Sequence, residues 1–277
     1  MDPNTGLSEP FAPAGLPPRA GKPRENGLTM FMDSGISLPE QRGLLDLFGQ
    51  HVDAAKILTT TAGLIDGDLL RAKISAYREA GVKPFPGGMF AEYAFSVGTV
   101  EAYLDACVEV GFPLVEISQN ITDAGPDGRR ALVAAARARG LEVLGEVGGK
   151  TGHVGAEAMA AEARDFLDAG AWKVLVEARE FIAADGAFDR ELWDGLAQRV
   201  DASSLWVELP GSWISNVHNY QVYETMVWLV THVGTEANIA NVDSRDVMKL
   251  ETIRRRIGPN MHGLLSESPA ARVRLRR

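Results

Sequence analysis

Four short apolar runs that end in or next to a glutamate lie between residues 114 and 208: Leu114-Val115-Glu116-Ile117, Glu142-Val143-Leu144-Gly145-Glu146, Lys173-Val174-Leu175-Val176-Glu177 and Leu205-Trp206-Val207-Glu208. Their length and their aliphatic, β-branched content are typical of buried strands. The four glutamates follow one another at intervals of 30, 31 and 31 residues, which is the spacing of strands joined by a crossover helix. The repeat therefore predicts consecutive βα units with parallel strands.

The alternation of strand-like and helix-like segments continues on both sides of this stretch. Eight strands are expected, at residues 28–33, 52–57, 82–85, 114–117, 142–146, 173–177, 205–208 and 237–240. Each is followed by a segment with helical apolar spacing, and several of these segments end at a glycine, a residue that readily closes a helix. Eight successive βα units in a chain of 277 residues predict a single (β/α)8 TIM barrel, with its active site at the carboxyl ends of the strands.

The two ends of the chain differ from the expected barrel. Residues 1–24 are rich in proline, glycine and alanine, so we expect a flexible N-terminal extension. Residues 25–258 form the expected catalytic domain, and residues 259–277 a short, solvated basic tail.

Composition limits the classes of partner and compartment. The formal net charge of −9 is unfavourable for a general nucleic-acid or anionic-membrane surface. The sequence has no apolar run long enough to cross a bilayer, no signal-peptide pattern and a single cysteine, Cys107, which cannot form an internal disulfide. We therefore expect a cytoplasmic protein that binds a small anionic substrate, and neither nucleic acid nor membrane. Self-association into a homo-oligomer is left open.

The four glutamates of the opening runs should meet at one rim of the barrel, because matching positions of neighbouring strands share a layer. Converging carboxylates repel one another, so cations must compensate them. Lys56, Lys150 and Arg179 lie at the same strand ends, and Asp33 adds an acid at the end of the first strand. Carboxylates with water and an anionic substrate suit magnesium, whereas the five histidines show no paired zinc-ligand spacing. The alternative interpretation is that the glutamates make interstrand salt bridges that only close the barrel.

Two glycine-rich turns follow predicted strands. Residues 144–151, Leu-Gly-Glu-Val-Gly-Gly-Lys-Thr, look like a phosphate-binding P-loop, but that pattern requires a glycine where Leu144 stands. A turn that lets the backbone and Lys150 approach an oxyanion is the better interpretation. Pro86-Gly87-Gly88 forms the second turn, and Glu92 follows it within reach of the rim.

Eight short motifs stand in order at the predicted strand ends. They are Pro23-Arg24-x-x-Gly27-Leu28-Thr29 leading to Asp33; Asp53-x-x-Lys56; Pro86-Gly87-Gly88 followed by Glu92; Val115-Glu116-Ile117-Ser118; Glu146-Val147-Gly148 with Lys150; Glu177-Ala178-Arg179-Glu180; Glu208-x-Pro210; and Asn238-Ile239-Ala240-Asn241. Through these motifs the chain resembles the phosphosulfolactate synthase family over roughly residues 23 to 257. The resemblance implies a lyase-type barrel enzyme that adds sulfite to the carbon–carbon double bond of phosphoenolpyruvate with magnesium, in a route to coenzyme M.

The resemblance also implies roles for the residues at the rim. The catalytic residues are expected to be Lys56, Glu92, Lys150 and Arg179. Their three basic side chains would hold the substrate anions, and Lys150 would donate the proton. Magnesium is expected on Glu116, Glu146 and Glu177, directly or through water. Substrate contacts are expected from Asp33, Ser118, Glu180, Glu208 and Asn241.

The sequence departs from the family pattern near the rim. Gln119-Asn120 stands where family members tend to carry Asp-Gly, and Gly149-Lys150 replaces two lysines. Gly211-Ser212-Trp213 replaces a lysine followed by paired glutamines. The substrate therefore stays open between phosphoenolpyruvate and a different 2-oxo acid or phosphorylated compound. A non-catalytic member similar to the plant heat-stress relatives, and a Schiff-base aldolase, are further alternatives.

Overall fold

The computed structural model describes residues 17, 19–120, 122, 124–148, 154–182, 189–211 and 217–259. Its strands are β1 (Thr29–Asp33), β2 (Ala54–Ile57), β3 (Lys83–Pro86), β4 (Leu114–Ile117), β5 (Glu142–Val147), β6 (Lys173–Glu177), β7 (Leu205–Glu208) and β8 (Ile239–Val242). Every boundary lies within about two residues of the position expected from the sequence. The eight-strand prediction is therefore confirmed.

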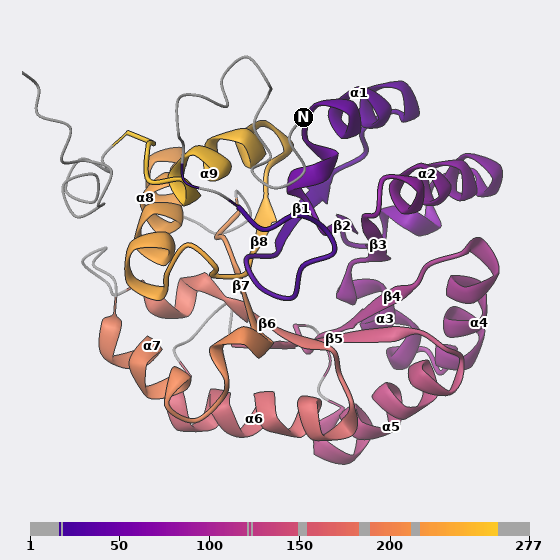
Figure 1. The fold of residues 1–277 in the computed structure, drawn as a ribbon. Helices are drawn as coiled ribbons and strands as arrows, with labels where there is room; N and C mark the ends of the chain where they lie inside the picture. The colour runs from indigo at the N-terminus through magenta and orange to yellow at the C-terminus, as the bar shows by residue number, and fades with distance from the viewer. Residues whose placement is uncertain are drawn as a thin grey trace, which may run out of the picture.

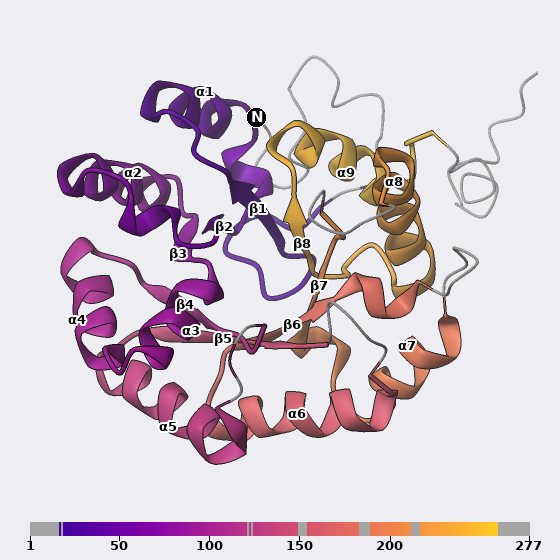
Figure 2. The same ribbon diagram turned by 180° about the vertical axis from the view of Figure 1, so that it is seen from behind.

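The strands form one parallel sheet that curves into a (β/α)8 barrel, as predicted. Hydrogen-bonded neighbours follow the order β3-β2-β1-β8-β7-β6-β5-β4, and the ends of this order, β3 and β4, lie next to each other (Figures 1 and 2). The barrel therefore has a seam between β3 and β4.

Two prolines explain the seam. Lys83 and Gly87 donate their backbone N–H groups to the carbonyls of Asp53 and Ile57, both at 2.9 Å, so alternate residues of β3 turn their N–H toward β2. Pro84 and Pro86 occupy the positions in between, which face β4, and proline has no N–H to donate. The side of β3 that faces β4 thus lacks the donors that a complete ladder requires.

Helices form a ring outside the strands (Figure 1). They are α1 (Leu38–Phe48), α2 (Gly67–Glu79), α3 (Gly88–Ser96), α4 (Val100–Val110), α5 (Gly125–Ala138), α6 (Ala156–Ala169), α7 (Arg190–Ala197), α8 (Asn219–Trp228) and α9 (Val247–Arg254). Asp66 caps α2 by accepting from the backbone N–H groups of Asp68 and Leu69. Gly111 and Gly170 end α4 and α6 with φ of 96° and 101°, a conformation that glycine adopts without strain.

The strand side chains divide into an inner and an outer set, because successive side chains of a strand point to opposite faces. The inner set fills the barrel and consists of Leu28, Met30, Ala54, Phe85, Leu114, Leu144, Leu175, Trp206 and Ala240. The outer set, which includes Phe31, Val115, Val143 and Val174, packs against the helices. Where a strand is regular, side chains two residues beyond members of the inner set therefore form the next layer inside the barrel.

The segment before β1 packs against the end of the barrel that holds the amino termini of the strands. Arg19 and Arg24 are buried and pair with Glu251 at 2.5 Å and Asp53 at 3.0 Å. The predicted boundaries at residues 24 and 258 stay predictions, and residues 1–16, 18 and 260–277 lie outside the described part of the chain. Among the described residues, no helix combines the length and apolar character that a membrane crossing would need.

Candidate active site

A layer of charged side chains lies two residues beyond the apolar filling of the barrel, at the carboxyl ends of the strands. Lys56, Glu116, Glu146, Glu177 and Glu208 follow Ala54, Leu114, Leu144, Leu175 and Trp206. All five are buried, with exposures from 1% for Glu177 and Glu208 to 7% for Glu146. The structure therefore brings the four predicted glutamates to one mouth of the barrel, as their spacing in the sequence indicated.

Lys56 crosses the interior to two of these glutamates. Its Nζ lies 2.9 Å from Oε2 of Glu116 and 2.7 Å from Oε1 of Glu208. Strands β4 and β7 are not neighbours of β2 in the sheet, so these pairs span the barrel rather than join adjacent strands. Burial by itself lowers the pKa of Lys56, but Glu116, Glu208 and Glu146 outweigh that effect and raise the pKa above its usual value. Lys56 is therefore a fixed cation in an acidic layer.

A second group of contacts joins the loop after β4 to α3. Oε1 of Glu92 accepts hydrogen bonds from the Ser118 hydroxyl, from the backbone N–H of Asn120 at 2.9 Å and from its side-chain amide at 3.2 Å. Oε2 of Glu92 accepts from the backbone N–H of Thr122 at 3.0 Å. The amide of Asn120 also donates to Oε2 of Glu146 at 3.2 Å. Asn120 thus links the Glu92 group to the charged layer.

The loops after β5 and β6 meet beside Glu177. Oε1 of Glu177 accepts from the backbone N–H of Arg179, and Oε2 of Glu180 accepts from that of Val154 at 2.8 Å. Gly148 lies against both acids, because a Cβ at that position would stand 3.2 Å from Cγ of Glu180 and 3.4 Å from Cβ of Glu177. Arg179 donates from Nη1 to the carbonyl of Ile182, a contact within its own turn.

Asp33 does not join the mouth. It follows the outward-facing Phe31 by two residues and therefore points into the layer between β1 and the helices. There its Oδ2 binds Nζ of Lys73 at 2.8 Å and the hydroxyl of Tyr77 at 2.7 Å. The expectation that Asp33 adds to the acidic rim is corrected by this geometry, because its position on the strand has the opposite phase to that of the glutamates.

Asn241 is turned by an irregularity in β8. The register between β1 and β8 shifts, so that Thr29 pairs with Ile239 and Phe31 with Val242, and Asn241 has a φ of 55°. Ile239 and Val242 both pack toward the helices, which leaves Ala240 and Asn241 between them to face inward. The side-chain oxygen of Asn241 is buried and has no hydrogen-bond partner among the described residues.

Comparison with known proteins identifies the family. The family model described as (2R)-phospho-3-sulfolactate synthase (ComA) matches residues 17–259. The chain belongs to this family. It is 31% identical over 241 residues to the phosphosulfolactate synthase of Methanocaldococcus jannaschii, covering 83% of this chain and 92% of that protein. It is 26% identical over 249 residues to the enzyme of the same name from Bacillus subtilis, covering 86% and 93%.

Members of the (2R)-phospho-3-sulfolactate synthase family are enzymes of the carbon–sulfur lyase type, so the prediction of such an enzyme is confirmed. Solved structures support the barrel but not the chemistry, because their sequences are distant. The 3-hexulose-6-phosphate synthase of Salmonella typhimurium superposes with a TM-score of 0.52 at 12% identity, covering 83% of this chain and 99% of that one. A truncated 3-deoxy-D-arabino-heptulosonate 7-phosphate synthase from Thermotoga maritima gives 0.54 at 12% identity, covering 87% of each chain.

The donor atoms of the charged layer decide whether it fits a metal ion. Within the part of the chain that the structure describes, no three His, Cys, Asp or Glu side chains are grouped in a way that could hold a metal. Glu116 is paired with Lys56, and the three-glutamate magnesium site expected from the sequence stays a prediction. Magnesium commonly uses only one or two protein carboxylates and completes its shell with water and substrate phosphate.

The sequence-based expectations for the mouth of the barrel are incomplete in two ways. Four residues named in the sequence analysis lie outside the described part of the chain: Gly149, Lys150, Ser212 and Trp213. The roles of the predicted site residues stay predictions. Sequence reasoning missed Asn120 as a bridge between two acids. It also missed the close approach of Gly88, where a Cβ would stand 2.8 Å from Oε1 of Glu116 and would collide with the Ser118 hydroxyl. The paired glycines at the end of β3 were the available signal.

Proposed function

We propose that this chain adds sulfite to phosphoenolpyruvate and forms (2R)-phospho-3-sulfolactate. Membership of the family over residues 17–259 supports this reaction class. The observation that carries the proposal is the buried layer of Lys56 and four glutamates at the carboxyl ends of the strands, where barrel enzymes hold their substrates. Burying so many charges is costly, which favours a role in chemistry over one in stability alone.

The proposed reaction sets three requirements. The lone pair on the sulfur of sulfite forms a bond to the terminal methylene carbon of phosphoenolpyruvate. The electrons of the double bond move to the neighbouring carbon and are delocalised into its carboxylate, and a proton then adds to that carbon. No oxidant or reductant is consumed. The site must therefore bind two anions, stabilise an enolate-like charge and deliver one proton.

The basic residues of the chain meet these requirements in our proposal. An ammonium group has three N–H donors. Nζ of Lys56 donates one hydrogen bond to Oε1 of Glu208 and forms an ion pair with Glu116. We propose that a further N–H of Lys56 binds the substrate carboxylate. Arg179 and Lys150 hold phosphate and sulfite, and Lys150 supplies the proton.

The polar residues around them orient the substrate. We propose direct contacts from Ser118, Glu180, Glu208 and Asn241; the buried oxygen of Asn241, which lacks a described partner, can accept a hydrogen bond from a protonated substrate oxygen or water. Glu92 acts as a positioning residue, because it holds Ser118 and the backbone of Asn120 and Thr122.

Magnesium is part of the proposal with a smaller ligand set than the sequence suggested. We propose that Glu146 and Glu177, on the adjacent strands β5 and β6, hold Mg²⁺ together with water and substrate oxygens. When bound, the ion neutralises charge that develops on substrate oxygens.

The direct test is to incubate the protein with phosphoenolpyruvate, sulfite and MgCl2 and to follow the phosphorus NMR spectrum for a new phosphate ester. Mass spectrometry then identifies the carbon–sulfur adduct. Lys150→Ala is expected to abolish product formation with an unchanged circular dichroism spectrum, and EDTA to suppress it in the parent protein. The surface variant Lys249→Ala, on α9, is the matched control and should retain full turnover.

Absence of the adduct with any divalent metal would exclude this reaction. The same assay would then be repeated with other 2-oxo acids and phosphorylated compounds, which the departures at Gln119 and Asn120 leave open. Turnover by Lys150→Ala at the parent rate would remove Lys150 from the mechanism.

A further inference from the structure

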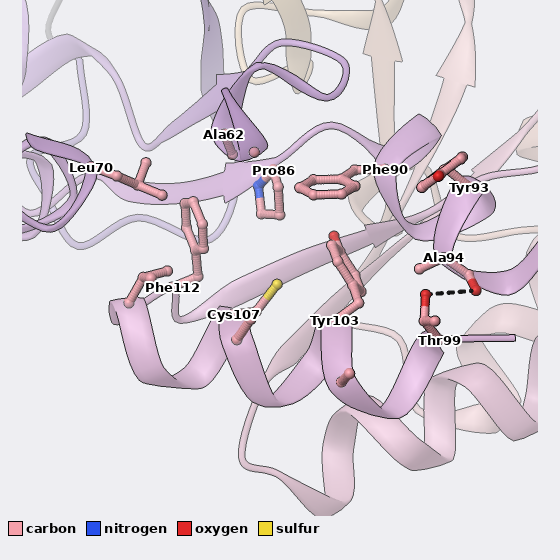
Figure 3. Close-up of a pocket in the computed structure, with 14 residues that line it drawn as sticks. Ala62, Leu70, Pro86, Phe90, Tyr93, Ala94, Thr99, Tyr103, Cys107 and Phe112 are labelled. Atoms are coloured by element: carbon pink, nitrogen blue, oxygen red, sulfur yellow. Dashed lines mark hydrogen bonds between the residues drawn. The ribbon is translucent and has the colours of Figure 1, made fainter. Parts of the chain in front are cut away.

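A cavity lies outside the barrel, beside α3 (Figure 3). It has a volume of about 340 Å³ and opens to solvent on one side. It is lined by residues from the short turn at residues 61–63, the end of β3, and helices α2, α3 and α4. That volume falls within the lower range of small-ligand pockets. The cavity is distinct from the charged mouth, because α3 turns Glu92 toward the mouth while Phe90 and Ala94 line the cavity.

The wall of this cavity is apolar and aromatic. Phe90, Tyr93, Tyr103 and Phe112 supply rings, and none of the lining residues carries a formal charge at neutral pH. The rings of Phe90 and Tyr103 pack with their centroids 5.0 Å apart. A wall of this kind excludes the phosphorylated and sulfonated anions of the proposed reaction, because nothing in it would repay their desolvation.

One polar group points into this apolar space. Tyr103 is 8% exposed, and its hydroxyl is buried without a nitrogen or oxygen partner among the described residues. Figure 3 shows the hydroxyl directed from α4 toward Phe90 and Pro86. The hydroxyl shares a hydrogen bond with the thiol of Cys107, one helical turn further along α4, and sulfur is only a weak acceptor. By contrast, the Thr99 hydroxyl is satisfied by the carbonyl of Ala94.

We propose that this cavity binds a small, uncharged, largely apolar molecule that carries one hydrogen-bond acceptor, such as a carbonyl oxygen. The aromatic wall supplies the apolar contact area. The Tyr103 hydroxyl donates to the acceptor and thereby satisfies a buried donor that otherwise lacks a strong partner. This inference concerns a site separate from the mouth and does not depend on the proposed reaction.

The test uses acetophenone, a neutral aromatic ketone, with the full-length protein and isothermal titration calorimetry. We expect one binding site in the parent chain. Tyr103→Phe removes only the hydroxyl and should weaken binding about fivefold. Ala106→Phe places a ring at the rim of the cavity and should abolish binding, whereas Ala158→Phe, on the exposed face of α6, should leave the affinity unchanged.

Cys107 reports where the ligand binds, because it is the single cysteine of the chain and lines the cavity. Burial raises the pKa of its thiol to about 12, so its slow reaction with methyl methanethiosulfonate is followed by mass spectrometry at pH 9. Acetophenone should slow this reaction several-fold in the parent chain and not in Ala106→Phe. Absence of binding, equal affinity in Tyr103→Phe, or an unprotected Cys107 would each overturn the proposal.

Discussion

At the scale of single residues, the side chain of Asn120 decides how the acids of the mouth are held. Its amide donates to Glu92 on α3 and to Glu146 on β5, so one neutral group links two carboxylates. An amide suits this position because it offers two N–H donors without adding charge.

We predict that Asn120→Asp is more damaging than Asn120→Ala. Both variants lose the two hydrogen bonds, which costs roughly 1–3 kcal/mol of unfolding free energy. Aspartate adds a third carboxylate beside Glu92 and Glu146, so its repulsion raises the cost further near neutral pH. Urea unfolding at pH 7.5 and at pH 5 measures both variants, and the gap between them should shrink at pH 5. A gap that is independent of pH would contradict the bridging role.

At the scale of elements, the loops after β5 and β6 approach each other through a glycine. Gly148 has a φ of 102° and lies against Glu177 and Glu180. A side chain at this point would be strained in its backbone and would press on both acids.

Gly148→Ala should therefore cost about 2–3 kcal/mol of unfolding free energy and impair turnover, because Glu177 and Glu180 must move. Gly140→Ala is the matched control. It has a φ of 78° but nothing within 4 Å of the added Cβ, so it should cost only about 1 kcal/mol and leave turnover intact. Chemical unfolding and the sulfite addition assay distinguish the two. If Gly148→Ala and Gly140→Ala changed turnover equally, the contact of residue 148 with Glu177 and Glu180 would be unimportant for activity.

A lysine in the segment before β1, Lys22, should make the unfolding free energy vary with pH in the alkaline range. Lys22 is mostly buried and donates to the carbonyls of Gly49 and Ala80. Burial lowers the pKa of Lys22 from 10.5 to about 8, with a smaller opposing effect from Asp53. Between about pH 8 and 10.5 the unfolded chain therefore binds a proton that the folded chain has released.

In that window this lysine should make the unfolding free energy rise with pH. The slope is at most about 1.4 kcal/mol per pH unit, and smaller in practice because the side chain is partly exposed to solvent. Lys22→Met should lack this contribution, so the difference between parent and variant should change steadily from pH 8 to pH 10.5. Denaturant titrations at each pH measure both proteins. If the unfolding free energies of parent and variant change with pH in parallel, the prediction is wrong.

At the scale of the whole molecule, a lysine joins two non-neighbouring strands near each end of the barrel. Lys56 joins Glu116 and Glu208 in the buried layer at the carboxyl ends of the strands. At the opposite end Lys83 pairs with Glu142 at 2.6 Å, and its Nζ lies 3.9 Å from the ring centroid of Trp172. The side chains of Lys83 and Glu142 are 37% and 43% exposed.

The two lysines should therefore differ in their contribution to stability. Lys56→Met leaves two buried carboxylates without their cation and should cost about 3–5 kcal/mol. Lys83→Met removes a partly exposed pair and a cation–π contact, so about 1 kcal/mol is expected. Guanidinium unfolding curves provide both values. Similar losses would mean that the buried layer is held by groups other than Lys56.

The sequence alone determined the positions of the eight strands and the common layer of the four glutamates. Both follow from local and periodic properties: apolar runs of strand length, and a repeat of about 31 residues that returns each glutamate to the same position of a βα unit. Glu116, Glu146, Glu177 and Glu208 could be placed together because neighbouring parallel strands end at one rim.

Only the tertiary structure decided which partner each charge has. The strands are apolar on both faces, so the sequence does not reveal which face is inward, and Asp33 turned out to face the helices while the glutamates face the interior. The contacts of Lys56 with Glu116 and Glu208, and of Asn120 with Glu92 and Glu146, join residues far apart in the chain. Such pairs depend on barrel closure and side-chain packing, which are properties of the folded molecule and leave no local pattern in the sequence.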